Sequence, residues 1–181
     1  MVTFFNYFKS LKNIEKIFFI FFVLYFIGLM CYLFSNKTHF LWDFQVYYSA
    51  AKCYTHGLNP YNIKELFSVH TNVSQLPYMY PPIAIYYFLP FSFLNIQLAI
   101  TIYLCIKILA LIALFYTWFK IYFDKKYLIV FLYFSLLAFN AAIHKDLITG
   151  NISIFEQLLI WIAIYFFLKE KLWIFRLNRQ K

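Results

Sequence analysis

Residues 17–34 form an uncharged apolar run that closes only at Asn36 and Lys37. At about 1.5 Å per residue, a helix over this run reaches about 27 Å, enough to cross the hydrocarbon core of a bilayer. Similar runs cover 96–119, 127–143 and 152–168, and the chain is 64% hydrophobic but only 13% charged. A soluble domain carries about 25% charged residues. The sequence therefore predicts an all-α integral membrane protein with about four transmembrane helices in one membrane domain.

The basic residues indicate the orientation of these spans. Lysines precede the first span, residues 120–126 are basic, and the tail from Lys169 carries further Lys and Arg residues. Four spans place all three clusters on one side, which the positive-inside rule assigns to the cytoplasm. We expect a multi-pass protein of a bacterial plasma membrane, with its N-terminus in the cytoplasm and residues 37–95 forming an outer loop. The net charge of +9 does not indicate nucleic acid, because the aromatic residues lie in continuous apolar runs.

The outer loop concentrates the turn-forming residues. All five prolines lie between positions 60 and 90, together with Gly57, one of only three glycines. Asp43 can begin a helix near 43–56 that Gly57 would end, and its apolar and polar stripes predict a helix lying on the membrane surface. Residues 83–94 are too few to span and predict a second juxtamembrane helix, interrupted by Pro90. A chain that gathers turns and polar groups in one loop is expected to use that loop as its working surface.

Asp43 has two compatible interpretations. It can cap the helix that follows it, or it can act as a general base held ionised by the helix N-terminus. The sequence contains no glycine-rich phosphate loop and no Asp-x-Asp pair, so we expect neither a nucleotide-sugar site with a divalent metal nor any other cofactor.

Other ionisable and aromatic residues are candidates for a site. Lys107 and Glu156 fall inside predicted spans, where they can form a structural pair or, for Lys107, contact a buried anionic group. His144 and Asp146 can mark a short loop or line the same outer cavity as Asp43. Tyr80, close to the double proline, can belong to an interfacial aromatic belt or shape a site for a lipid phosphate or a sugar.

An ordered set of motifs in the outer loop resembles glycosyltransferase family 87. The motifs are Asp43, Val46-Tyr47-Tyr48, Ala50-Ala51, Gly57, Asn59-Pro60-Tyr61 and Tyr78-Met79-Tyr80-Pro81-Pro82. Downstream, Gly150-Asn151 is similar to the family's Gly-Gln-x-Asn element, with Asn151 where the family usually has Gln. That family contains polyprenol-phosphate-mannose-dependent α-mannosyltransferases with the GT-C membrane fold.

The resemblance implies a function. Asp43 would be the catalytic base, and Tyr47, Tyr48, Asn59, Tyr61, Tyr80, Lys107, His144, Asp146 and Asn151 would be candidate substrate-binding residues. The implied reaction moves a hexose, expected to be mannose, from a polyprenyl-monophosphate donor to a glycolipid or glycan acceptor on the outer side of the membrane, with inversion. The resemblance covers about the first half of the family's length, so we expect an N-terminal fragment that needs further spans or a second chain. A non-catalytic membrane subunit and a lipid or polysaccharide transporter component are the alternatives.

Overall fold

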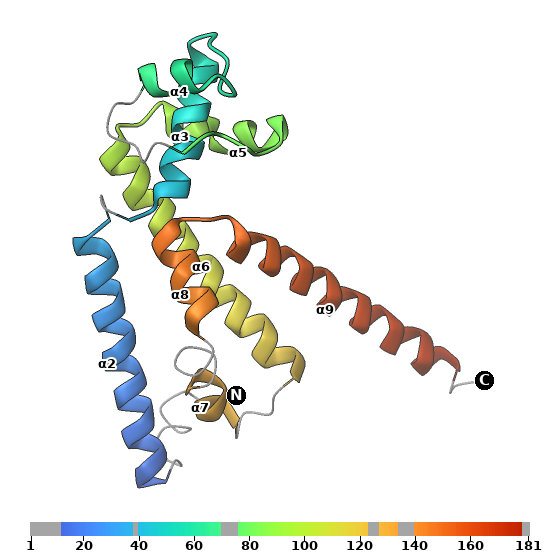
Figure 1. Cartoon of the computed structure of the whole chain (residues 1–181). Helices are drawn as coiled ribbons and strands as arrows, with labels where there is room; N and C mark the ends of the chain where they lie inside the picture. Colours follow the sequence, from blue (N-terminus) through green and yellow to red (C-terminus); the bar gives the residue numbers. More distant parts are fainter. Residues whose placement is uncertain (1–11, 38–39, 70–75, 123–126, 134–139, 179–181) are drawn as a thin grey trace.

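The computed structural model describes residues 12–37, 40–69, 76–122, 127–133 and 140–178, and all of its regular structure is helical (Figure 1). Within these ranges there are eight helices. They are α2 (Asn13–Ser35), α3 (Trp42–Thr55), α4 (Ile63–Val69), α5 (Pro82–Ser92), α6 (Ile96–Tyr122), α7 (Leu128–Tyr133), α8 (Asn140–Thr149) and α9 (Ser153–Asn178). Figure 1 shows α3, α4 and α5 gathered at one end of α6. Helix α9 packs against α6, with the Trp118 and Trp161 ring centroids 6.0 Å apart.

Helices α2 and α6 are long and apolar enough to cross a bilayer. Helix α2 buries only Leu29 and Leu33 and exposes large apolar side chains along the rest of its length. Helix α6 buries a single stripe that includes Tyr103, Lys107 and Leu111, and exposes Leu109 and Ile112 on its other side. Such extensive apolar exposure is unusual for a soluble monomer and suits a lipid solvent.

The sequence-based view of residues 43–56 as a surface helix is wrong in one respect. Helix α3 does not expose a polar face, because Gln45 and Ser49 are buried together with most of its apolar residues. Helices α4, α5, α6 and α8 pack around α3, and Gln45 Nε2 donates a hydrogen bond to the Phe40 carbonyl at 2.9 Å. A helix covered on all sides is part of a core, so α3 is the centre of the outer assembly.

The end of α3 follows from Gly57. Its φ is +71°, a left-handed conformation that glycine adopts without steric cost. The Gly57 amide donates to the Tyr54 carbonyl, and the Leu58 amide donates to the Cys53 carbonyl, both at 3.0 Å. These two hydrogen bonds form a Schellman motif, which satisfies the last carbonyls of the helix.

Three boundaries differ from the sequence-based expectations. Helix α5 continues through Pro90 to Ser92 rather than breaking there. Residues 127–143 are not described as one helix, since α7 ends at Tyr133, residues 134–139 lie outside the described ranges, and α8 continues to Thr149. Residues 144–149, expected in a loop, are therefore helical. Helix α9 extends to Asn178, ten residues beyond the expected end of the last span at 168.

Candidate active site

Asp43 lies in the first turn of α3, but it does not cap that helix. Leu41 occupies the N-cap position with φ +60° and ψ +35°, and the structure gives it no side-chain capping bond. The N-cap interpretation of Asp43 is therefore wrong. Its carboxylate is half-buried and remains close to the positive end of the α3 dipole, which favours a negative charge.

The turn between α8 and α9 holds the start of α3. The Leu41 amide donates to the Ile148 carbonyl at 2.6 Å. Gly150 has φ +77°, and a Cβ atom placed on it would lie 3.0 Å from Leu41 Cα and 3.1 Å from Phe44 Cβ. Only glycine allows this approach, so the two residues flanking Trp42 and Asp43 rest directly on the turn.

A buried ion pair lies beneath the same turn. Lys107 Nζ on α6 is 2.8 Å from Asp146 Oδ2 on α8, and the Lys107 side chain is fully buried. The ammonium group also donates to the Asp146 carbonyl at 2.6 Å and to the Asn151 carbonyl. Within the described ranges neither carboxylate oxygen of Asp146 has a hydrogen-bond partner, so Oδ2 is held by the ion pair alone. Lys107 therefore forms an ion pair, as one interpretation of the sequence expected, but its partner is Asp146. Glu156, the other ionisable residue in a predicted span, is exposed on α9.

Tyr103 lies four residues before Lys107 on α6 and also binds the segment that joins α8 to α9. Its hydroxyl donates to the Gly150 carbonyl at 2.8 Å and reaches the Asn151 carbonyl at 3.2 Å. Its ring stacks on Phe44, with centroids 4.2 Å apart and an interplanar angle of 19°. Tyr103 therefore connects the span α6 with both the α8–α9 turn and the start of α3.

The charges around Asp43 have opposing effects. Burial raises the pKa of the Asp43 carboxyl above its ordinary value of 3.8, and the charge of Asp146 adds to this. The Thr149 side chain, Lys107 and Lys145 act in the opposite direction. A carboxylate with a raised pKa is a stronger proton acceptor than an ordinary aspartate, which is what a general base requires.

A large cavity of about 710 Å³ adjoins this cluster. Its wall comes from α5, α6, the α8–α9 turn and α9, and is mostly apolar and aromatic. Tyr103 and Asn151 belong both to this wall and to the cluster around Lys107, and Tyr80 and Glu156 add polar atoms. Mostly apolar walls with a few placed polar groups are typical of ligand sites.

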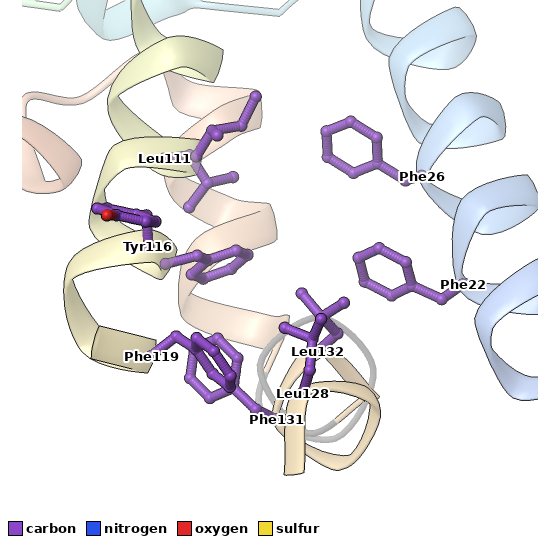
Figure 2. Close-up of a pocket in the computed structure, with 10 residues that line it drawn as sticks. Phe22, Phe26, Leu111, Tyr116, Phe119, Leu128, Phe131 and Leu132 are labelled. Carbon is purple, nitrogen blue, oxygen red and sulfur yellow. The ribbon is translucent and has the colours of Figure 1, made fainter. Parts of the chain in front are cut away.

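A second cavity offers a contrast. It measures about 280 Å³ and lies between α2, α6 and α7, where Phe22, Phe26, Leu111 and Phe131 line it (Figure 2). The side chains drawn in Figure 2 are aliphatic or aromatic, and the Tyr116 hydroxyl supplies their one oxygen. This cavity lacks the groups needed to orient a sugar, so we place the candidate site at the larger one.

The structure separates the predicted site residues into two groups. Asp43, Lys107, Asp146 and Asn151 come together through the α8–α9 turn, and Tyr80 reaches the cavity wall. Tyr47 lies behind Tyr80, with ring centroids 4.5 Å apart, and burial raises the pKa of its hydroxyl.

The second group has structural contacts instead. The Tyr48 hydroxyl donates to the Leu94 carbonyl at 2.8 Å, and the Tyr61 hydroxyl donates to the Tyr80 carbonyl at the same distance. The Asn59 side-chain oxygen accepts the Tyr61 amide at 3.0 Å, closing a local turn. His144 is half-buried on α8 and is not among the residues that contact Lys107.

Sequence reasoning missed Tyr103, Thr149 and Lys145. Tyr103 and Lys107 are four residues apart, a spacing that places them on one face of a helix, so this signal was present in the sequence. Thr149 and Lys145 act on Asp43 only because α8 docks on α3. No local pattern indicates that contact.

Comparison with known proteins places these features in a family. A family model described as glycosyltransferase family 87 matches residues 78–176. Tyr80, Lys107, Asp146 and Asn151 lie inside the matched region, while Asp43 lies before it. Neither a curated protein nor a solved structure matches the sequence. Because the family model matches more than half of the 181 residues, the chain belongs to glycosyltransferase family 87, a family of membrane glycosyltransferases with the GT-C fold.

Proposed function

We propose that this protein transfers a hexose, expected to be mannose, from a polyprenyl-monophosphate donor to a hydroxyl of a glycolipid or glycan on the outer side of the membrane. The observation that carries the proposal is the position of Asp43. Its half-buried carboxylate stands at the start of α3, where the charges of Lys107 and Asp146 act on it. Lys107 binds the Asn151 carbonyl, and Asn151 and Tyr103 are part of the neighbouring cavity wall. The family membership supports the reaction class.

In the proposed reaction Asp43 accepts the proton of the acceptor hydroxyl. The acceptor oxygen forms a bond to the anomeric carbon of the donor sugar as the bond from that carbon to the phosphate oxygen breaks. The electron pair leaves with the lipid phosphate, and attack from the opposite side inverts the anomeric configuration. A lipid phosphate is already a good leaving group, so proton removal and positioning are the main tasks for the protein.

The cavity supports a lipid-linked donor. Its walls are largely apolar and aromatic, and its rim includes Ile83, Ile106 and Leu159, which are exposed on the surface of the helices. An aromatic wall suits a sugar ring, and an apolar rim suits a hydrocarbon chain. We further propose four spans with the N-terminus in the cytoplasm, the orientation that the basic clusters favour. We also propose that a second chain can associate with this one to complete the fold.

The test replaces Asp43 with Asn, which has the same shape but cannot accept the proton. Full-length protein in native membranes is given polyprenyl-phosphate [¹⁴C]mannose, with polyprenyl-phosphate glucose as a competing donor, and labelled glycolipid is counted. We expect transfer to fall on the order of 10²- to 10⁴-fold at unchanged protein level.

Glu170→Gln is the matched control, since it makes the same chemical change at an exposed position on α9. This variant should transfer at the wild-type rate. Wild-type transfer by Asp43→Asn would remove Asp43 from the mechanism. Preference for the glucose donor would correct the sugar while leaving the reaction class intact.

A further inference from the structure

We propose that the Lys107 ammonium and the Tyr103 hydroxyl are positioning groups that fix the location of Asp43. This inference rests on the function proposed above and concerns how its base is held. Both residues lie on α6, and together they bind the carbonyl oxygens of Asp146, Gly150 and Asn151 in the α8–α9 turn. We call these two residues and three carbonyls the clamp.

Lys107 is already engaged by groups of the protein. An ammonium group has three N–H donors, and that of Lys107 donates to the Asp146 and Asn151 carbonyls while its charge is paired with the Asp146 carboxylate. Its side chain is fully buried. A donor phosphate would have to displace one of these partners, so the geometry favours a structural target for this cation. The ammonium also lies at the C-terminal end of α8, where the helix dipole favours a positive charge.

The clamp transmits position to Asp43 through two contacts. Tyr103 binds the Gly150 carbonyl, and Gly150 lies so close to Leu41 and Phe44 that an added Cβ would come within 3.1 Å of both. Phe44 also stacks directly on the Tyr103 ring. Asp43 is next to Phe44 in the sequence and two residues from Leu41. Because both of these residues contact the clamp, the clamp fixes the backbone on either side of Asp43. A shift of the turn would displace the carboxylate, and a displacement of about 1 Å can cost on the order of 10²-fold in rate.

The test needs a variant that removes the clamp and still folds. Lys107→Met alone leaves the Asp146 carboxylate buried without a cation, which is strongly destabilising. The double variant Lys107→Met/Asp146→Leu replaces the pair with apolar side chains, a change that is often neutral. Tyr103→Phe is a milder variant, since it removes the hydroxyl and keeps the ring stacked on Phe44. Tyr116→Phe is its control, because it deletes an exposed hydroxyl on the same helix.

Steady-state kinetics of full-length protein in membranes separate positioning from binding. We expect kcat to fall on the order of 10²-fold in the double variant and about tenfold in Tyr103→Phe. The donor KM should stay within about threefold of wild type, and Tyr116→Phe should be unchanged. If the double variant does not accumulate, Tyr103→Phe decides the question by itself.

Two outcomes would overturn the clamp. Wild-type kcat in the variants that accumulate would reduce Lys107 and Tyr103 to structural residues. A raised donor KM with unchanged kcat would assign Lys107 to donor binding. Asp43→Asn, assayed in parallel, distinguishes the two proposals: if it is inactive while the clamp variants are active, only the clamp fails, whereas an active Asp43→Asn removes the base itself.

Discussion

Gly150 and Gly57 form a matched pair for testing whether the α8–α9 turn rests on α3. Both have a left-handed φ, +77° and +71° respectively. A Cβ atom at Gly57 would meet nothing within 4 Å, while one at Gly150 would lie 3.0 Å from the Leu41 backbone. In Gly57→Ala the cost is the backbone penalty alone, about 1–2 kcal/mol. In Gly150→Ala the same penalty is joined by overpacking, which adds about 1–3 kcal/mol.

The difference between the two variants therefore isolates the contact. We expect Gly150→Ala to lower the free energy of unfolding by about 1–3 kcal/mol more than Gly57→Ala, measured by reversible SDS titration of the purified protein in mixed micelles. Gly150→Ala should also lower the transfer rate, because Leu41 and Phe44 must move to admit the methyl group and Asp43 moves with them. Equal destabilisation by the two substitutions would refute the close approach and the positioning argument built on it.

Two further properties can be measured. The raised pKa of Asp43 means that the folded protein binds this proton more tightly than the unfolded chain, so the free energy of unfolding should decrease as pH rises from 3.8 through the raised value. The Asp43→Asn variant should not show this decrease. The transfer rate of the wild type should fall as pH drops below the raised pKa, because the base is then protonated. Topology can be tested with a membrane-impermeant maleimide added to intact cells: Thr55→Cys, at the exposed end of α3, should react, whereas native Cys53 should not because it is fully buried. Glu170→Cys should react only after permeabilisation, and its labelling in intact cells would reverse the proposed orientation.

Helix positions were the most predictable part of this protein. The apolar runs at 17–34 and 96–119 correspond to α2 and α6, because a long apolar run has few alternatives to a helix in lipid. Gly57 ends α3 as the sequence indicates, since the left-handed position excludes most other residues. In contrast, the continuation of α5 through Pro90 was missed. A proline inside a helix costs about 3 kcal/mol, and the sequence does not show the packing of α5 against α3 that can offset this cost.

The arrangement of the candidate site was only partly predictable. Asp43 and Lys107 were identified as unusual charges, but the partner of Lys107 was not, because Asp146 lies on a helix that had been expected to be a loop. The burial of Gln45 and Ser49 was also missed. Periodicity shows which side of a helix is apolar, but it cannot show that other helices cover the polar side as well.

If the donor is lipid-linked, as proposed, the rim of the large cavity determines how it reaches the site. Ile83, Ile106 and Leu159 carry the cavity edge onto an exposed apolar surface, so a lipid donor can reach the wall by lateral diffusion without passing through water. Encounter then occurs in two dimensions, and the relevant concentration is the mole fraction of donor in the membrane. Adding inert lipid or detergent at constant bulk donor should slow transfer by surface dilution. A KM in moles per litre would therefore describe the preparation as much as the protein.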